Sequence, residues 1–319
     1  MLHLFNASTL AGVLFLLLLG ACSTPQTSAL RRAAPAGLPA HTELRNVAFY
    51  PQEEFQCGPA TLAMLMHTAG VQVEPGQLRE FLFLPEKQGS LQVEMLATTR
   101  RYGLLAYLLK PELTDVLLEV AAGNPVIVLQ NLGLNWYPLW HYAVVIGYDL
   151  NREEMILRSG ENERLTLSFT TFEHTWARSQ HWAMLALPPS RLPQTAVPEN
   201  LLQSLAALAH SSPDTDAGPA YTAALQRWPD NLPVQIAAGN HAYTQGKPEQ
   251  AAQIFLAATQ AHPDSAAAFN NLAQTLSDLG KHDAALQAIR RALDIGGPLE
   301  PLIRKTLAEI EQKKRDSLK

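Results

Sequence analysis

The spacing of apolar residues divides the chain into three parts. Residues 10–21, LAGVLFLLLLGA, form an uninterrupted apolar run; residues 43–188 alternate helix-like and strand-like patterns; and residues 199–315 are rich in Ala and Leu at helical spacing. Two stretches rich in Pro, Ala, Ser and Thr, 22–42 and 189–198, separate these parts. We expect a flexible tether at the first and a linker at the second.

The middle part combines predicted helices with predicted strands. CGPATLAMLMHTAG (57–70) is predicted to form a helix, with Pro59 in its first turn and Gly70 at its end. Further helices are expected at 90–102 and 112–122, and strands at 125–131, 141–149, 154–160, 165–172 and 181–187. Helices followed by several adjacent strands indicate an α+β domain with a mainly antiparallel sheet.

The third part contains a repeat of 34 residues. The equivalent pairs are Pro229 and Pro263, Gly246 and Gly280, Ala251 and Ala285, and Ala258 and Ala292. This pattern resembles the tetratricopeptide repeat, in which small residues let two helices pack closely and proline marks the boundary between units. We expect two clear repeats, a degenerate one that begins near residue 199, and a polar terminal helix over 300–315 as a cap.

The N-terminal apolar run is too short for a stable membrane-spanning helix and has the length of a signal-peptide core. It ends in Leu19-Gly20-Ala21-Cys22, which resembles a bacterial lipobox. The resemblance implies that residues 1–21 are a lipoprotein signal peptide and that Cys22 carries the lipid. Ser23 after the cysteine favours the outer membrane. An ordinary cleaved signal peptide is the alternative.

The composition excludes several classes of function. The chain has 319 residues, of which 47% are hydrophobic and 17% charged, and a formal net charge of −5, so it has no large basic patch for nucleic acid. It contains no HExxH, paired CxxC or GxxxxGK[ST] motif. We therefore expect no metal ion, no nucleotide and no other cofactor.

The second of the two cysteines, Cys57, has no disulfide partner if Cys22 is lipid-modified. Exported proteins usually pair their cysteines, so an unpaired thiol is either a buried small side chain or a reactive group. Cys57 lies at the predicted start of a helix, where the helix dipole lowers a thiol pKa. Gly58 next to it is expected to let a substrate backbone approach.

His141, at the start of a predicted strand, is the candidate base for Cys57. Gln52 and the Cys57 amide would form an oxyanion hole, with Gln56 as the alternative side chain. If the hairpin turns near 150–151, the residue that orients His141 lies between 159 and 162, where the candidates are Ser159, Glu161 and Asn162. Trp136, Tyr137 and Trp140 would line either a substrate cleft or the core.

The order of Gln52, Cys57-Gly58 and His141-Tyr142 resembles the double-glycine-leader, or bacteriocin-processing, cysteine peptidases over roughly 45–188. The resemblance implies a papain-like fold and carries the family's glutamine, cysteine and histidine to Gln52, Cys57 and His141. The family's third residue, an aspartate, is missing, because its place reads Leu157-Arg158-Ser159-Gly160. Ser159 or Asn162 would then orient His141, or Asp149 from a rearranged turn.

Together these features predict a papain-like peptidase domain (43–188) followed by an all-α tetratricopeptide-repeat domain (199–315). They are similar to Gram-negative lipoprotein peptidases. We expect a lipid-anchored periplasmic cysteine peptidase that cleaves a peptide or protein substrate, with repeats that recruit the substrate or a protein partner. The alternatives are a peptidoglycan endopeptidase and a non-catalytic peptide-binding scaffold.

Overall fold

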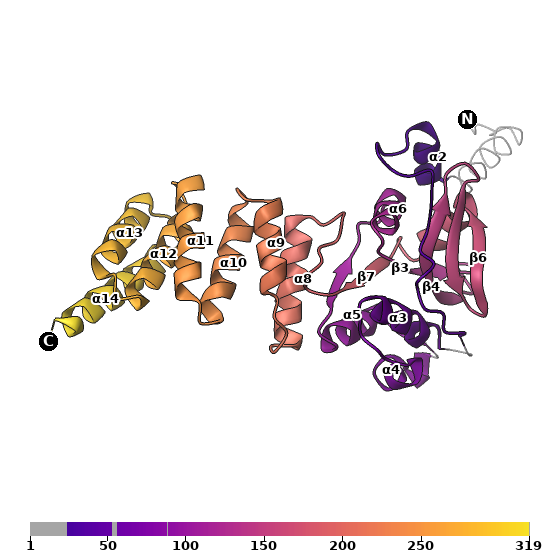
Figure 1. The fold of residues 1–319 in the computed structure, drawn as a ribbon, viewed down its shortest axis with the longest axis horizontal. Coiled ribbons are helices and arrows are strands. Elements are labelled where there is room, and N and C mark those ends of the chain that lie inside the picture. Colours follow the sequence, from indigo (N-terminus) through magenta and orange to yellow (C-terminus); the bar gives the residue numbers. More distant parts are fainter. Residues whose placement is uncertain (1–23, 53–55, 88, 319) are drawn as a thin grey trace, which may run out of the picture. The chain divides into compact units, whose positions relative to one another are not determined.

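The computed structural model describes residues 24–52, 56–87 and 89–318, and it divides into two compact units (Figure 1). The first unit extends to Pro188 and also includes residues 193–195, which lie within the expected linker, 189–198. Residues 1–21 and Cys22 lie outside the described residues. Within those residues, no helix is both long enough and apolar enough to cross a membrane.

A sheet of seven strands forms the centre of the first unit. The strands are β1 (His41–Glu43), β2 (Leu105–Leu108), β3 (Val126–Asn131), β4 (Trp140–Asp149), β5 (Glu154–Ser159), β6 (Asn162–Ser168) and β7 (Ala183–Leu187). Their order is β2-β7-β3-β4-β5-β6, with β1 paired to the far end of β4. Every pairing is antiparallel, which confirms the predicted α+β class with an antiparallel sheet.

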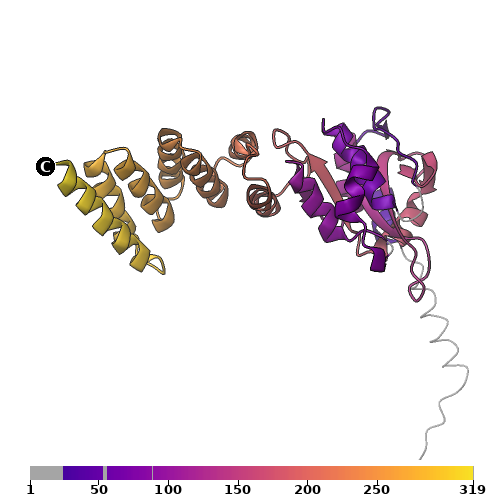
Figure 2. The ribbon, with the colours of Figure 1, turned by 90° about the horizontal axis from the view of Figure 1, so that it is seen from below.

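Helices cover both faces of this sheet. They are α2 (Pro25–Arg32), α3 (Cys57–Thr68), α4 (Pro75–Leu82), α5 (Gln92–Arg101), α6 (Leu113–Ala121) and α7 (Phe169–Ala177), with a short 3-10 helix, η2 (Pro85–Lys87). Helix α3 packs on β3, β4 and β7, whereas α6 and α7 pack on β3 from the other side (Figures 1 and 2). Ile127 and Leu129 belong to the core beneath α3, so the alternate residues Val126 and Val128, also buried, face α6 and α7.

Two segments differ from the sequence-based expectations. Residues 25–32, expected within a flexible tether, form helix α2, with Thr27 and Leu30 buried. Residues 165–172, expected to be one strand, are divided between β6 and α7. The division falls at Ser168, whose hydroxyl accepts a hydrogen bond from the Thr171 amide and caps the new helix. The helix α4 and the strands β1 and β2 were not predicted.

The second unit consists of α8 (Pro198–Ser211), α9 (Gly218–Arg227), α10 (Leu232–Thr244), α11 (Pro248–Ala261), α12 (Ala266–Asp278), α13 (His282–Ile295) and α14 (Glu300–Ser317). The pairs α10–α11 and α12–α13 are the two clear repeats. At Gly239 of α10 an added Cβ would lie 2.4 Å from the ring of Phe255, so this helix pair packs too closely for any larger residue. The structure confirms the helical repeat region.

Candidate active site

Cys57 is the first residue of α3, the helix that packs on β3, β4 and β7. Every residue from Gly58 to Met66 is buried, so the helix is surrounded by protein on nearly all sides. Pro59, in the first turn, has no N–H that would need a partner there. The thiol is therefore held on a rigid element at the edge of the core.

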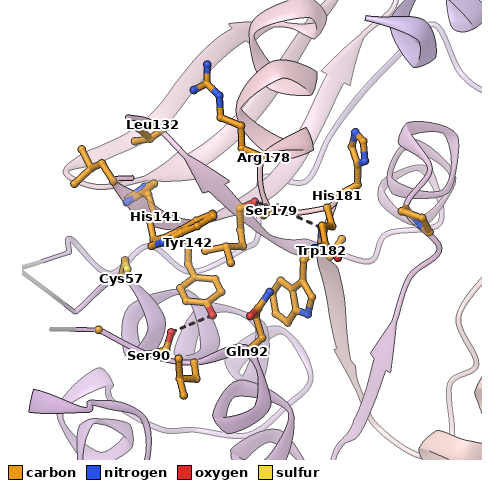
Figure 3. A pocket seen from close by; sticks show the side chains of 18 of the residues that line it. Cys57, Ser90, Gln92, Leu132, His141, Tyr142, Arg178, Ser179, His181 and Trp182 are labelled. Atoms are coloured by element: carbon orange, nitrogen blue, oxygen red, sulfur yellow. Dashed lines mark hydrogen bonds between the residues drawn. The ribbon is translucent and has the colours of Figure 1, made fainter. Parts of the chain in front are cut away.

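Gln52, Cys57 and His141 line a single cavity of about 1060 Å³. Figure 3 shows Cys57 and His141 in its wall. His141 is the second residue of β4, and its neighbour Tyr142 contributes a backbone amide close to the Cys57 sulfur. The start of α3 and the start of β4, 84 residues apart along the chain, are thus adjacent. The structure brings together all three residues that were predicted to carry the chemistry.

Burial raises the pKa of the Cys57 thiol above its ordinary value. The backbone amides of Tyr142, Gly58 and Cys57 itself act in the opposite direction, but they do not outweigh the burial. The amides at the helix start act in the expected direction, but the net shift is opposite to the one expected, because the site is more enclosed than a helix end at the surface. The resting thiol is protonated at neutral pH, and a base must take its proton when it attacks.

His141 is suited to accept that proton. Burial lowers the pKa of its imidazole, so the ring is neutral at neutral pH. Its Nε2 lies 2.8 Å from the Oγ of Ser159, a residue that is itself buried. When Nε2 carries the ring proton, it donates a hydrogen bond to the Ser159 hydroxyl. The unprotonated Nδ1 is then the nitrogen available to Cys57.

Of the residues predicted to orient His141, Ser159 is the one in contact with it. Asn162 lies exposed across the β5–β6 hairpin, opposite Ser159. Asp149 lies at the other end of β4, eight residues and about 26 Å from His141. Its carboxylate accepts hydrogen bonds from the amides of Asn151 and Arg152 in the turn. The proposal that Asp149 orients the imidazole is therefore wrong.

Gln52 is held by its backbone and faces the cavity. Its amide donates to the Gly160 carbonyl at 3.1 Å, and its Nε2 lies 3.4 Å from the Tyr142 carbonyl. Its Oε1 is buried without a hydrogen-bond partner among the described residues. Gln56, the alternative, is the N-cap residue of α3 and is not one of the described residues that line the cavity. Gln52 is thus the better placed of the two for an oxyanion hole.

The structure gives a reason for glycine at position 58 other than the expected approach of a substrate backbone. A Cβ added there would lie 2.3 Å from the Oγ and 2.6 Å from the Cβ of Ser90. The Ser90 carbonyl also accepts a hydrogen bond from the Tyr142 hydroxyl at 3.2 Å. Glycine is required at position 58 because the segment around Ser90 packs directly against the start of α3, and not only to admit a substrate.

Apart from Trp140, the remaining wall of the cavity was not predicted from the sequence. Its apolar side is formed by Leu108, Leu109, Leu129, Leu132, Leu139 and Trp140. The turn from Arg178 to Ala183 closes another side, and two of its non-glycine residues, Gln180 and His181, have positive φ angles of 59° and 57°. Such conformations are set by tertiary packing, so no local pattern could have revealed them.

The three aromatic residues near His141 separate into two groups. Trp140 lines the cavity, whereas Trp136 and Tyr137 are not among the described cavity-lining residues. These two side chains are 81% and 73% exposed at the tip of the β3–β4 hairpin. The core alternative is therefore wrong for both. No cluster of three or more His, Cys, Asp or Glu that could hold a metal occurs in the described part of the chain.

Comparison with known proteins agrees with this architecture. Residues 44–184 match the model of the Peptidase_C39 like family, and residues 236–300 match the tetratricopeptide repeat. The chain thus has a C39-like peptidase domain followed by tetratricopeptide repeats. No curated protein gives a sequence match.

Two solved structures are similar to part of the chain. One is a putative C39-like peptidase from Bacillus anthracis, with 20% identity over 47% of this chain and 98% of that one, at a TM-score of 0.38. The other is the peptidase domain of Streptococcus ComA, a bifunctional ABC transporter involved in a quorum-sensing pathway. It has 24% identity over 45% of this chain and 99% of that one, at a TM-score of 0.37.

Proposed function

We propose that this protein is a cysteine peptidase that hydrolyses a peptide bond of a polypeptide substrate, with Cys57 as nucleophile and His141 as base. The observation that carries the proposal is the meeting of Gln52, Cys57 and His141 in one cavity, with His141 bound to Ser159. The C39-like peptidase domain supports the same class of reaction.

The reaction begins when Nδ1 of His141 takes the proton of the Cys57 thiol as the sulfur attacks the peptide carbonyl. The Cys57 amide and the Gln52 side chain donate hydrogen bonds to the oxyanion. The peptide C–N bond then breaks, His141 gives its proton to the leaving amine, and an acyl-enzyme remains. Water, deprotonated by His141, hydrolyses the thioester and restores the thiol.

Ser159 holds the imidazole ring in place but supplies no negative charge. A carboxylate in its position would stabilise the imidazolium that forms during attack, whereas a hydroxyl fixes the ring and its tautomer only. The catalytic step therefore depends on the orientation of His141 more than on electrostatic support from its partner. We expect a slower enzyme than one with an aspartate at this position.

The shape and lining of the cavity favour an extended polypeptide with apolar side chains near the cleaved bond. Its six apolar wall residues flank the catalytic groups, and its volume can hold several side chains. A peptide library with apolar or charged residues around the cleavage site tests this preference. Equal cleavage of both kinds would contradict it.

We also propose that Cys22 carries a lipid and anchors the protein in the bacterial envelope, on the periplasmic side of the outer membrane. The support is the sequence Leu19-Gly20-Ala21-Cys22 after an apolar run. The repeats would recruit the substrate or a protein partner. Metabolic labelling with a fatty acid should mark the wild-type protein and not Cys22→Ala, and fractionation should place it in the outer membrane.

The decisive test of the peptidase is a comparison of the N-termini of exported proteins from cells with the wild-type protein and with Cys57→Ala. New termini should occur only with the wild type, and the purified variant should keep its fold. Identical termini together with muropeptide release by the wild-type protein would instead indicate a peptidoglycan endopeptidase.

A peptide-binding scaffold is the second candidate function, and two observations favour it. The partner of His141 is an uncharged serine, and burial raises the pKa of the Cys57 thiol. Alkylation of Cys57 by iodoacetamide across pH, with and without a bound peptide, separates the two. If the bound peptide accelerates alkylation in the wild type and not in His141→Ala, the result supports the peptidase. If alkylation is equally slow in the wild type and in His141→Ala, the result supports the scaffold.

A further inference from the structure

Helix α2 is hydrogen-bonded to the rest of the peptidase domain through a buried carboxylate. Glu173 of α7, only 2% exposed, accepts hydrogen bonds from the amides of Gln26 at 3.0 Å and Thr27 at 2.6 Å. A carboxylate at this place satisfies amides that the helix itself leaves unpaired and interacts favourably with the helix dipole. The start of α2 is thus fixed on the domain.

The side chain of Gln26 joins this start to the wall of the catalytic cavity. Its Nε2 donates to the Pro111 carbonyl at 3.0 Å, and its Oε1 accepts from the Leu113 amide. Pro111 is itself one of the residues that line the cavity. The other end of α2 is held by the ion pair of Arg31 with Glu153. The first turn of α2 therefore lies beside the cavity and cannot swing away without breaking these contacts.

Very little chain separates this fixed helix from the predicted lipid. Pro25, the first residue of α2, follows Cys22 by three positions, which is a reach of at most about 11 Å. A lipid on Cys22 would therefore hold the cavity side of the domain close to the bilayer, and not at the end of a long tether.

The tip of the β3–β4 hairpin gives a second, independent indication. It presents Trp136, Tyr137 and Leu134, which are 81%, 73% and 52% exposed and are not among the described residues that line the cavity. The same hairpin contributes Leu132 (Figure 3) and Trp140 to the cavity wall, so its tip lies next to the cavity. Exposed tryptophan and tyrosine beside leucine are typical of side chains that lie at a membrane–water interface.

This tip is held in one shape. Nη1 of Arg178 donates to the carbonyls of Asn131 and Gly133 at 2.9 and 2.8 Å. The Oδ1 of Asn131 accepts from the amides of Gly133 and Leu139, both at 2.9 Å. This network fixes the backbone of the hairpin, so the tip that carries these apolar side chains keeps its place beside the cavity. They need an external partner if they are to leave water.

We propose that the cavity rim defined by the start of α2 and by Trp136 and Tyr137 faces the bilayer, with these two aromatic side chains at the level of the lipid headgroups. The proposal rests on the lipid attachment and peptidase activity proposed above. The substrate is then a polypeptide segment held at the membrane surface, since soluble chains have poorer access to a cavity that faces lipid.

The test uses the lipidated full-length protein in vesicles of phosphatidylethanolamine and phosphatidylglycerol that contain spin-labelled lipid. In a Cys57→Ser background, an environment-sensitive dye is placed by Tyr137→Cys at the hairpin tip or by Glu80→Cys on α4, which packs against α3 and α5. The proposal predicts severalfold stronger quenching at position 137 than at 80. Equal quenching, or stronger quenching at 80, overturns it.

Two variants test the cause of this orientation. Glu173→Gln with Gln26→Ala releases α2 and should reduce quenching at 137 towards the level at 80. A long Gly-Ser insertion between Ser23 and Thr24 leaves every contact of α2 intact and should have the same effect, so the test holds even if the first variant folds poorly. Unchanged quenching with the insertion contradicts the role of the short connection.

The membrane and the substrate can be distinguished as partners of the hairpin tip. Trp136→Ser with Tyr137→Ser should leave kcat and KM for a soluble peptide in detergent unchanged and should reduce cleavage of a vesicle-bound peptide. Leu256→Ser, at an exposed apolar position on α11, is the matched control. A raised KM for the soluble peptide assigns the tip to substrate binding and overturns the proposal. Absence of all cleavage contradicts the peptidase and not the quenching result.

Discussion

The Nε2 of His141 and the Oγ of Ser159 lie 2.8 Å apart, on two adjacent antiparallel strands. A neutral hydrogen bond of this kind contributes about 1 kcal/mol, and an unoriented ring loses that much or more of transition-state stabilisation. Ser159→Ala should therefore reduce kcat by about tenfold, with a smaller effect on KM. Asn162→Ala, on the exposed side of the hairpin, should change neither parameter.

Ser159→Asp should restore a charged partner to the imidazole. A carboxylate next to the ring favours the imidazolium, so the pKa of His141 rises. The acidic limb of the pH profile of kcat/KM should then move to higher pH relative to the wild type, and kcat at its plateau should increase. An acidic limb that moves to lower pH, or does not move, would show that Ser159 does not face the base during turnover.

Two partly buried histidines should make the folded protein less stable in acid. Burial lowers the pKa of His141 and of His181 in the folded state, so the unfolded chain binds more protons than the folded chain below its ordinary histidine pKa of about 6.5. Their contribution to stability is complete above that pH and is lost as the pH falls. Thermal melting between pH 8 and pH 5 measures it, and His141→Gln should flatten the slope.

Gly58→Ala should destabilise the peptidase domain by about 1–3 kcal/mol, because the added methyl group overlaps Ser90. Urea unfolding measures the loss. Combining it with Ser90→Gly removes the atoms that clash, so the double variant should recover part of the lost stability. A double variant that is as unstable as the sum of the single variants would show that the contact is not the cause.

Glu119 of α6 should control the linker that follows the peptidase domain. Its carboxylate is fully buried and accepts hydrogen bonds from the amides of Gln194 and Thr195 at 3.1 and 2.7 Å. Glu119→Gln removes the charge that holds these amides, so trypsin should cleave after Arg191 severalfold faster. Glu112→Gln, at the exposed start of α6, is the control and should leave the cleavage rate unchanged.

Local sequence was sufficient where an element is defined by its own residues. Three such features were predicted: the apolar helix that begins at Cys57, the strand from Val126 to Asn131 and the 34-residue repeat. They could be predicted because periodicity and turn residues act over short distances. Gln52, Cys57 and His141 were proposed from their residue types and from a family resemblance, and the structure places all three in one cavity. The helix α2 was missed, since its fixed start depends on Glu173, 147 residues from Gln26.

Tertiary structure alone decided the environment of these residues. The β4–β5 pairing shifts between Val145 and Gly147, so counting from the turn could not choose between Ser159 and Asn162, as a one-residue shift turns a side chain to the opposite face. Burial likewise reversed the expected direction of the Cys57 pKa shift. The sequence by itself determines which chemical groups are present and which local elements form. Strand register and desolvation are decided only when distant segments of the chain pack together.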